Sequence, residues 1–347
     1  MKSLSEIVRP HLLALAPRPS GTTRTNGEQT AVRLDANESP FNAPLNRYPD
    51  SGQQALRTAL SVVAGVRPEC IFPVSGGAEA VDTVLRVFCR PAVDNVAAID
   101  PTCEIYAARA AINDVEYRRV PLDVHFNFSA DALLETCDER TKVVFLCSPN
   151  SPTGNLPDRR EIERVLAAFG GIVVVDEAYI DFAGGASVLP MLTRYRNLVV
   201  LRSFSKAWAM AGVRIGAVLA APEVAALLKS VAVPCNVGRP AEENLLEMFR
   251  RRFDIDKWIK QTLDERTKVM LAVSELPYCR QVFPSQANFF LCRVVDAGRV
   301  HAYLAGQGIA VRNCSELTAC ENCLRLTIGL PHENNALISA LRNYPGR

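Results

Sequence analysis

Two side chains of the sequence could carry out chemistry, because each closely follows a run of apolar residues. Asp176 ends the run 172–176, and Lys206 follows the run 197–202. A carboxylate at the end of a buried strand is costly unless it meets a cation, and a protonated pyridine nitrogen would be such a partner. Tyr179 would place its phenol beside the same ring. The ordinary alternatives are a helix N-cap or a salt bridge for Asp176 and a solvated surface amine for Lys206.

Hydroxyl, guanidinium and glycine groups near Lys206 indicate a bound phosphate. Ser203 and Ser205 precede this lysine, and Arg214 follows it. Two hydroxyls and a guanidinium make a phosphate cradle, because the guanidinium fork matches phosphate oxygens. Residues 76–77 are both glycine and precede an amphipathic stretch, so backbone N–H groups at a helix start could approach the same anion. Together these groups predict a phosphorylated pyridine cofactor held at the lysine.

Short apolar segments alternate with amphipathic ones from about residue 47 to residue 220, which predicts a mostly parallel sheet covered by helices. A helix is expected over 159–169, where apolar residues recur at helical spacing. The strands, apolar along their length as expected of strands buried on both faces, are 95–99, 142–147, 172–176 and 197–202. Ligands bind beyond the carboxyl ends of such strands. The predicted site is therefore the set of loops 100–103, 148–154, 176–179 and 203–206.

Composition and charge exclude several other classes of protein. The 347 residues carry a net charge of +2, and no basic run with interleaved aromatics indicates nucleic-acid binding. The longest apolar runs are too short to span a membrane, and the N-terminus lacks the pattern of a secretory signal, so a cytoplasmic protein is expected. The 11 cysteines are expected to be reduced thiols. Cys320 and Cys323 have the spacing of half a zinc site, but without a second pair we expect packing and no metal.

Length predicts about two domains. The expected division is an N-terminal arm and loop over 1–40, a large cofactor-binding domain over 41–233 and a small α+β domain over 234–347. The hinge is placed in the segment 231–240, which holds two prolines and a glycine. The elements expected after it are a long helix over 241–276, strands over 288–294 and 324–328, and helices near 300–306 and from 333 onward.

Taken together, the motifs resemble those of histidinol-phosphate aminotransferases, within the fold-type I enzymes that depend on pyridoxal 5′-phosphate. The likeness runs from about Leu34 to the C-terminus, and the matching segments are Leu34-Asp-Ala-Asn-Glu-Ser-Pro40, Asn46-Arg-Tyr-Pro-Asp50, Ser148-Pro-Asn-Ser-Pro-Thr-Gly154, Asp176-Glu-Ala-Tyr179, Ser203-Phe-Ser-Lys206, Ala211-Gly-Val-Arg214 and Leu324-Arg-Leu-Thr-Ile-Gly329. The resemblance implies an α/β fold, with a mostly parallel seven-stranded sheet in the large domain and a smaller α+β C-terminal domain. It also implies a homodimer with shared active sites. The implied reaction, in histidine biosynthesis, converts L-histidinol phosphate and 2-oxoglutarate to imidazole acetol phosphate and glutamate.

The resemblance also implies a role for each matching residue. Lys206 would hold the cofactor as a Schiff base and carry a proton, Asp176 would pair with its ring nitrogen, and Tyr179 would bond its 3′-oxygen. The residues that would hold the cofactor phosphate are Gly77, Ala78, Ser203, Ser205 and Arg214, with Tyr48 reaching it from the neighbouring subunit. The residues that would bind substrate are Arg325 at a carboxylate, Arg312 at the phosphate of histidinol phosphate, and Asn37.

Three positions around the cofactor depart from the family pattern. Ser151 stands where an asparagine usually bonds the 3′-oxygen, and Cys103 stands where an aromatic ring usually stacks on the cofactor. Ala78 stands where an aspartate often precedes the glutamate. Because an aromatic stack contributes about 0.5–1.5 kcal/mol, we expect weaker cofactor retention. Tyr106, three residues after Cys103, is a candidate substitute for the missing ring.

Three other roles stay open at this point. Threonine-phosphate decarboxylases resemble the family and share an Arg-x-Cys pattern near the C-terminus, which Arg312-Asn-Cys314 matches. An aromatic amino-acid aminotransferase would use most of the same motifs. A cofactor-carrying relative without activity is suggested by Cys103 and Ser151, although Lys206 and Asp176 are both present.

Overall fold

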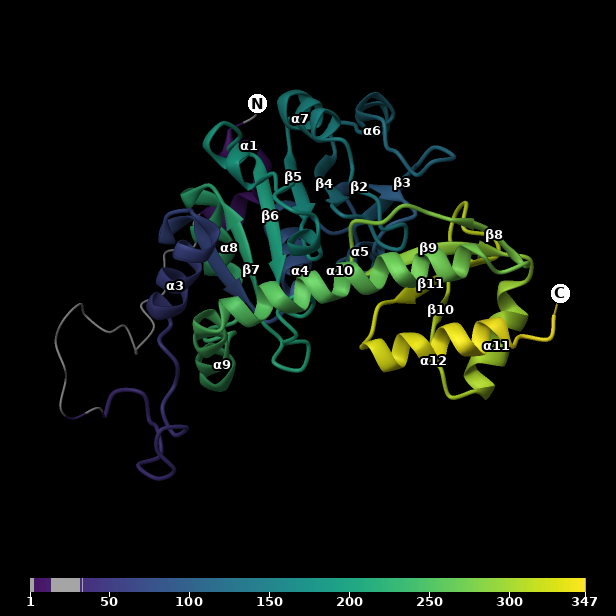
Figure 1. Cartoon of the computed structure of the whole chain (residues 1–347). Helices are drawn as coiled ribbons and strands as arrows, with labels where there is room; N and C mark the ends of the chain where they lie inside the picture. Colours follow the sequence, from purple (N-terminus) through teal and green to yellow (C-terminus); the bar gives the residue numbers. More distant parts are fainter. Residues whose placement is uncertain (1–2, 14–31, 33, 347) are drawn as a thin grey trace.

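The computed structural model describes residues 3–13, 32 and 34–346 of the chain. Its helices and strands are arranged around two sheets, one of seven strands and one of four (Figure 1). No helix in these described ranges is long and apolar enough to cross a membrane.

The large sheet has the strand order β1-β7-β6-β5-β4-β2-β3. Its strands are β1 (Ile71–Val74), β2 (Asn95–Asp100), β3 (Glu116–Pro121), β4 (Thr141–Cys147), β5 (Ile172–Asp176), β6 (Leu198–Ser203) and β7 (Gly216–Ala220). Strands β3, β2, β4, β5 and β6 run parallel, whereas β7 is antiparallel to both β6 and β1. The prediction of an α/β fold with a mostly parallel seven-stranded sheet is therefore confirmed.

Two hydrophobic cores cover the two faces of this sheet. Along β5, Val173 and Val175 belong to one core, and Ile172 and Val174 belong to the other. The helices packed in the first core are α3 (Gln54–Ala64), α6 (Ala130–Thr136), α7 (Arg159–Ala168), α9 (Arg239–Arg250) and the first turns of α10 (Arg252–Ser274). Those packed in the second are α1 (Leu4–Ile7), α2 (Pro10–Leu13), α4 (Gly77–Phe88), α5 (Ile105–Ile112) and α8 (Pro222–Val231). With both faces covered, polar loops can gather only along the edges where the strands end.

The small sheet is antiparallel and has the order β10-β11-β9-β8. Its strands are β8 (Cys279–Val282), β9 (Phe289–Val294), β10 (Arg312–Asn313) and β11 (Cys323–Thr327), and its helices are α10 (Arg252–Ser274), α11 (Ala297–Gly306) and α12 (Pro331–Arg342). Short 3-10 helices lie in connections of the large sheet: η1 (Pro68–Cys70), η2 (Ile180–Phe182) and η3 (Leu189–Thr193). The α10 helix runs from the end of the large sheet across to the small one (Figure 1).

The single long helix expected over 241–276 is wrong, because the chain turns at Arg251 and forms α9 and α10 instead. Arg251 has φ −97° and ψ 25°, outside the helical region. The turn lets Leu245 of α9 pack in the core of the large sheet, while Val269 and Val273 of α10 pack in the core of the small sheet. No glycine or proline interrupts 241–276, so the sequence carries no ordinary sign of this break.

Part of the expected N-terminal arm lies outside the described residues, namely 1–2, 14–31 and 33. The segment 34–50 extends away from the rest of the chain before α3 begins (dark purple in Figure 1). The division into domains at 40/41 and 233/234 stays a prediction.

Candidate active site

Loops after β2, β4, β5 and β6 bring the predicted residues together around Lys206. The Nζ atom of Lys206 lies 5.6 Å from the centroid of the Tyr179 ring. Burial of the amine lowers the pKa of Lys206, the positive charges of Arg325 and Arg214 lower it further, and Cys103 and Asp176 oppose this. Although Lys206 as a residue is exposed, enough protein surrounds its amine to disfavour the charged form and so shift its pKa downward. A lysine in this environment can act as a nucleophile and as a base.

Asp176 accepts hydrogen bonds from two groups at the end of β5. The Tyr106 hydroxyl donates to Oδ2 at 2.7 Å, and the Ala178 backbone N–H donates to Oδ1 at 3.1 Å. Burial raises the pKa of Asp176, while the Tyr106 and Ala178 hydrogen bonds and the charge of Lys206 hold it down. Asp176 makes no ion pair with any residue that the structure describes, so its carboxylate is suited to a cationic ring nitrogen of a ligand.

The expectation that Tyr106 substitutes for the missing stacking ring is wrong. Tyr106 is fully buried within the second core, and its ring stacks on Phe145 of β4, with ring centroids 4.9 Å apart and an angle of 10° between the planes. Its hydroxyl is fixed on Asp176 at the same time. Both ends of the side chain are thus engaged, and Tyr106 acts as a support for the carboxylate instead.

The start of α4 and the turn after β6 form the predicted phosphate cradle. Gly76 has φ +87°, and a Cβ atom there would clash with the guanidinium of Arg214, so only glycine allows this approach. Arg214 Nη1 donates to Ser205 Oγ at 3.3 Å, and the Ser205 backbone N–H donates to Ser203 Oγ at 3.3 Å. Helix α4 begins at Gly77, so its free N–H groups meet the same space. Two hydroxyls, a guanidinium and a helix start fit a phosphate group.

Arg325 packs on Phe289, an aromatic residue that the sequence motifs do not include. Its guanidinium lies 5.2 Å from the ring centroid of Phe289, and Phe289 meets Tyr179 edge-on at 5.0 Å and 84°. Arg325 Nη1 donates to Ser151 Oγ at 3.0 Å. Its Nε is buried and has no acceptor among the described residues. Ser151, one of the three departures from the family pattern, therefore supports the arginine expected to bind a carboxylate.

Arg312 lies directly opposite Arg325 in the β10–β11 pair, so both side chains are on one face of this hairpin. Arg312 forms an ion pair with Glu104, which directly follows Cys103 in the loop after β2. Glu104 has no signal in the sequence, because this ion pair joins residues 208 positions apart.

Cys103 lies close enough to Asp176, Lys206 and Arg325 for their charges to act on its thiol. Burial raises the pKa of Cys103 to about 11, so the group is a neutral thiol at ordinary pH. It packs against the second core of the large sheet. Cys103 thus contributes apolar contact to the site and no charge.

Asn37 and Tyr48 are not brought to Lys206 within the single chain. Both are exposed, with 58% of Tyr48 accessible, and both belong to the segment that extends away from the large sheet (Figure 1). The roles predicted for these two residues stay predictions.

Glu177 anchors the loop that carries Asp176 and Tyr179. Its side chain is 0% exposed and forms an ion pair with Arg202 of β6 at 3.0 Å. It also accepts hydrogen bonds from the Ser187 hydroxyl at 2.8 Å and from the Val188 N–H at 2.7 Å. Glu177 is a second carboxylate at the end of a buried strand, and this position is its only sign in the sequence.

We expect Glu177→Gln to lower the stability of the protein. The neutral amide leaves Arg202 without its charged partner and weakens the hydrogen bonds that Ser187 and Val188 donate to the carboxylate. A hydrogen bond to a charged group contributes about 1.5–3 kcal/mol, and the midpoint of urea denaturation should fall accordingly. Glu135→Gln is the matched control, since Glu135 is exposed on α6. Equal midpoints for the two variants would show that Glu177 does not anchor the loop.

Comparison with known proteins identifies the family. The model of aminotransferases of class I and II matches residues 21–341. A histidinol-phosphate aminotransferase of Bacteroides fragilis (strain YCH46) is 46% identical over 344 residues, covering 99% of this chain and all of the relative. Another, from Cytophaga hutchinsonii, is 38% identical over 346 residues and covers 99% of each chain. The chain belongs to the histidinol-phosphate aminotransferase family.

Solved structures share the fold of this family. The histidinol-phosphate aminotransferase of Clostridium acetobutylicum matches with a TM-score of 0.80 and 22% identity, covering 86% of this chain and 90% of that one. That of Sinorhizobium meliloti, in complex with pyridoxal-5′-phosphate, gives 0.78 and 21%, covering 89% of each. An L-threonine-O-3-phosphate decarboxylase of Porphyromonas gingivalis gives 0.73 and 22%, covering 86% of this chain and 91% of that one. At such identities the likeness shows the fold alone and does not separate the two activities.

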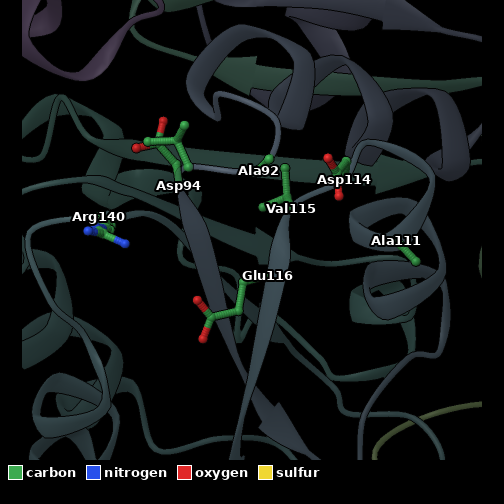
Figure 2. Close-up of a pocket in the computed structure, with 8 residues that line it drawn as sticks. Ala92, Asp94, Ala111, Asp114, Val115, Glu116 and Arg140 are labelled. Carbon is green, nitrogen blue, oxygen red and sulfur yellow. The ribbon is translucent and has the colours of Figure 1, made fainter.

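A separate hollow of about 310 Å³ lies away from the motifs of the aminotransferase family (Figure 2). It is lined by residues that precede or begin β2, β3 and β4, including Asp94, Glu116 and Arg140. Its Asp94 is already ion-paired with Arg90 at 2.9 Å. Ligands of parallel sheets bind at the carboxyl ends of the strands, whereas this hollow lies at their amino ends.

Cys320 and Cys323 are buried in an apolar cluster with Cys314, Phe126 and Phe283. Among residues 3–13, 32 and 34–346, no group of three or more His, Cys, Asp or Glu side chains could hold a metal ion. All eleven cysteines are free thiols. Both cysteines of the Cys-x-x-Cys segment therefore pack in this apolar cluster.

Proposed function

We propose that this protein transfers the amino group of L-histidinol phosphate to 2-oxoglutarate, giving imidazole acetol phosphate and glutamate in histidine biosynthesis. The observation that carries the proposal is the cross-strand pair Arg312 and Arg325, with Arg325 close enough to Lys206 to act on its pKa. Two guanidinium groups on one face of the hairpin, one of them near Lys206, suit a substrate that brings a phosphate or a second carboxylate. The names of the near full-length relatives support the same activity.

We propose pyridoxal 5′-phosphate as the cofactor, and three features of the chain fit it. Asp176 would meet the ring nitrogen, the cradle of Arg214 and the Gly76 turn would receive the phosphate, and Lys206 would attach the aldehyde. The remaining phosphate ligands would be the Gly77 and Ala78 backbone N–H groups and the Ser203 and Ser205 hydroxyls. When bound, the cofactor supplies a protonated ring that withdraws electrons from the substrate Cα.

The residues of the chain would orient the reactants and move protons. Lys206 Nζ would accept a proton from the substrate Cα and deliver it to the C4′ carbon of the cofactor. The lowered pKa of Lys206 favours the neutral amine that this transfer needs. Asp176, oriented by Tyr106, would keep the proton on the ring nitrogen. Tyr179 would donate a hydrogen bond to the ring oxygen. Arg325 would hold a substrate carboxylate, and Arg312 would hold the phosphate of histidinol phosphate.

We also propose a homodimer in which each chain lends Tyr48 to the cofactor-phosphate site of the other, and we propose that Asn37 binds substrate. The exposure of Tyr48 on an extending segment supports this. A cytoplasmic location is proposed as well, because eleven free thiols suit a reducing compartment.

A paired assay tests the proposed reaction. We expect purified enzyme, given histidinol phosphate and 2-oxoglutarate, to form glutamate, and we expect no carbon dioxide from threonine phosphate. The reverse pattern, carbon dioxide without glutamate, would replace the aminotransferase proposal with a decarboxylase. The decarboxylase shares the Arg312-Asn-Cys314 pattern, so the sequence alone does not separate the two.

A further inference from the structure

We propose that Glu104 sets the affinity and specificity of the substrate-phosphate site. Its carboxylate is an internal anion that binds Arg312, and an incoming phosphate competes with it for this arginine. The identity of the substrate rests on the proposed function, whereas the contact between Glu104 and Arg312 does not. Neither the family resemblance nor the comparisons assign a role to Glu104.

The contact joins the two parts of the chain across the candidate site. Glu104 is the N-cap residue of α5, in the loop after β2, and its Oε2 accepts a hydrogen bond from Nη2 of Arg312 on β10. The side chains are 57% and 45% exposed, respectively, so a ligand from solvent can reach both. The carboxylate thus occupies part of the coordination that an arginine would offer to phosphate oxygens.

The neighbouring contacts hold the hairpin over the same loops. Arg325, opposite Arg312, donates to Ser151 in the loop after β4, and the Thr318 hydroxyl donates to Asp100 at the end of β2. Both of these contacts involve a neutral hydroxyl. Arg325 can keep its bond to Ser151, and Asp100 its bond to Thr318, while each binds other groups. Only the Glu104 contact places a full negative charge on an arginine of the hairpin. A phosphate that uses Nη2 of Arg312 must therefore exchange with this carboxylate.

Such an exchange weakens the binding of every ligand that uses Arg312 and does not change the binding of other ligands. The apparent affinity is the intrinsic affinity multiplied by the fraction of molecules in which Arg312 is free. For an exposed ion pair this amounts to about a 2- to 5-fold effect. A free carboxylate gains little by replacing Glu104, because it substitutes one carboxylate for another that is already tethered. A dianionic phosphate gains more, but it still binds more weakly than it would to an unoccupied Arg312. The contact therefore lowers the preference of the site for phosphorylated over unphosphorylated donors.

Glu104→Gln tests the proposal in the holoenzyme, where the cofactor already fills its own phosphate site. Affinity for inorganic phosphate is measured from the rise in melting temperature with phosphate concentration. We expect it to increase about 2- to 5-fold in the variant. The KM for histidinol phosphate should fall by a similar factor, and the KM for unphosphorylated L-histidinol should not change. Arg312→Gln provides the baseline, because it removes the guanidinium that both anions share.

Glu316→Gln is the matched control, since Glu316 is also exposed, lies in the β10–β11 connection and removes the same charge. An equal gain in phosphate affinity in this variant would overturn the proposal, because the effect would then be a general one of net charge. Unchanged phosphate affinity in Glu104→Gln, or undiminished affinity in Arg312→Gln, would also overturn it. Phosphate binding does not require turnover, so an enzyme that shows the expected affinities without forming glutamate would contradict the proposed reaction alone.

Discussion

Lys206→Ala is expected to remove the covalent attachment of the cofactor and to lower transamination by at least about 10²–10⁴-fold, the usual contribution of a positioned proton-transfer group. The amine lies beside the Tyr179 ring, and burial and the charge of Arg325 lower its pKa. Alanine offers neither a nucleophile nor a base at this position. Borohydride reduction followed by mass spectrometry of the peptides measures the attachment, and glutamate formation measures the rate.

Lys229→Ala is the matched control for this experiment. Burial and the charge of Arg57 also lower the pKa of Lys229, but this residue belongs to α8, outside the four loops of the site. We expect the Lys229 variant to keep both the reduced adduct and its activity. If the Lys206 variant gave the same adduct on the same peptide, the assignment of the cofactor lysine would be wrong.

The strands that carry the site could be predicted from the sequence because they are buried on both faces. Strand β5 was predicted at both ends, and β2, β4 and β6 were predicted to within one residue, since an unbroken apolar run marks each of them. The edge strand β3 escaped notice because its sequence, Glu-Tyr-Arg-Arg-Val-Pro, is mostly polar and partly exposed. The turn between α9 and α10 could not be predicted either, because it depends on tertiary packing: α10 begins in the core of the large sheet at Ile255 and ends in the core of the small sheet at Val273.

The residues of the candidate site were predictable as positions along the chain, whereas most of their contacts were not. Local motifs identify Asp176 and Lys206, because each follows a buried strand. The contacts of Tyr106 with Asp176 and of Glu104 with Arg312 join residues 70 and 208 positions apart. Only the folded sheet brings such pairs together. The wrong expectation for Tyr106 arose because three residues of spacing from Cys103 cannot show that the ring turns into the core.

Asp176→Asn is expected to lower kcat by about 10²–10³-fold, the range found when one preorganised electrostatic group is removed. The neutral amide cannot stabilise a proton on the ring nitrogen of the cofactor, so the electron-withdrawing form of the ring is lost. Attachment of the cofactor to Lys206 should persist, which separates this defect from that of Lys206→Ala. The measurement is kcat together with the amount of borohydride-trapped cofactor. Full activity in the asparagine variant would show that Asp176 is not the partner of the ring.

Tyr106→Phe provides a graded test of the same carboxylate, because it removes the hydroxyl that donates at 2.7 Å and keeps the ring on Phe145. This hydrogen bond lowers the pKa of Asp176, so its loss should raise that pKa. A carboxylate with a raised pKa becomes protonated at higher pH, and the acidic limb of kcat/KM should shift upward in pH. Tyr117→Phe on β3 is the control and should leave the limb in place. If Tyr106→Phe lowered kcat/KM at every pH without shifting the acidic limb, the hydroxyl would serve packing alone. Only an effect carried through Asp176 shifts the acidic limb of kcat/KM.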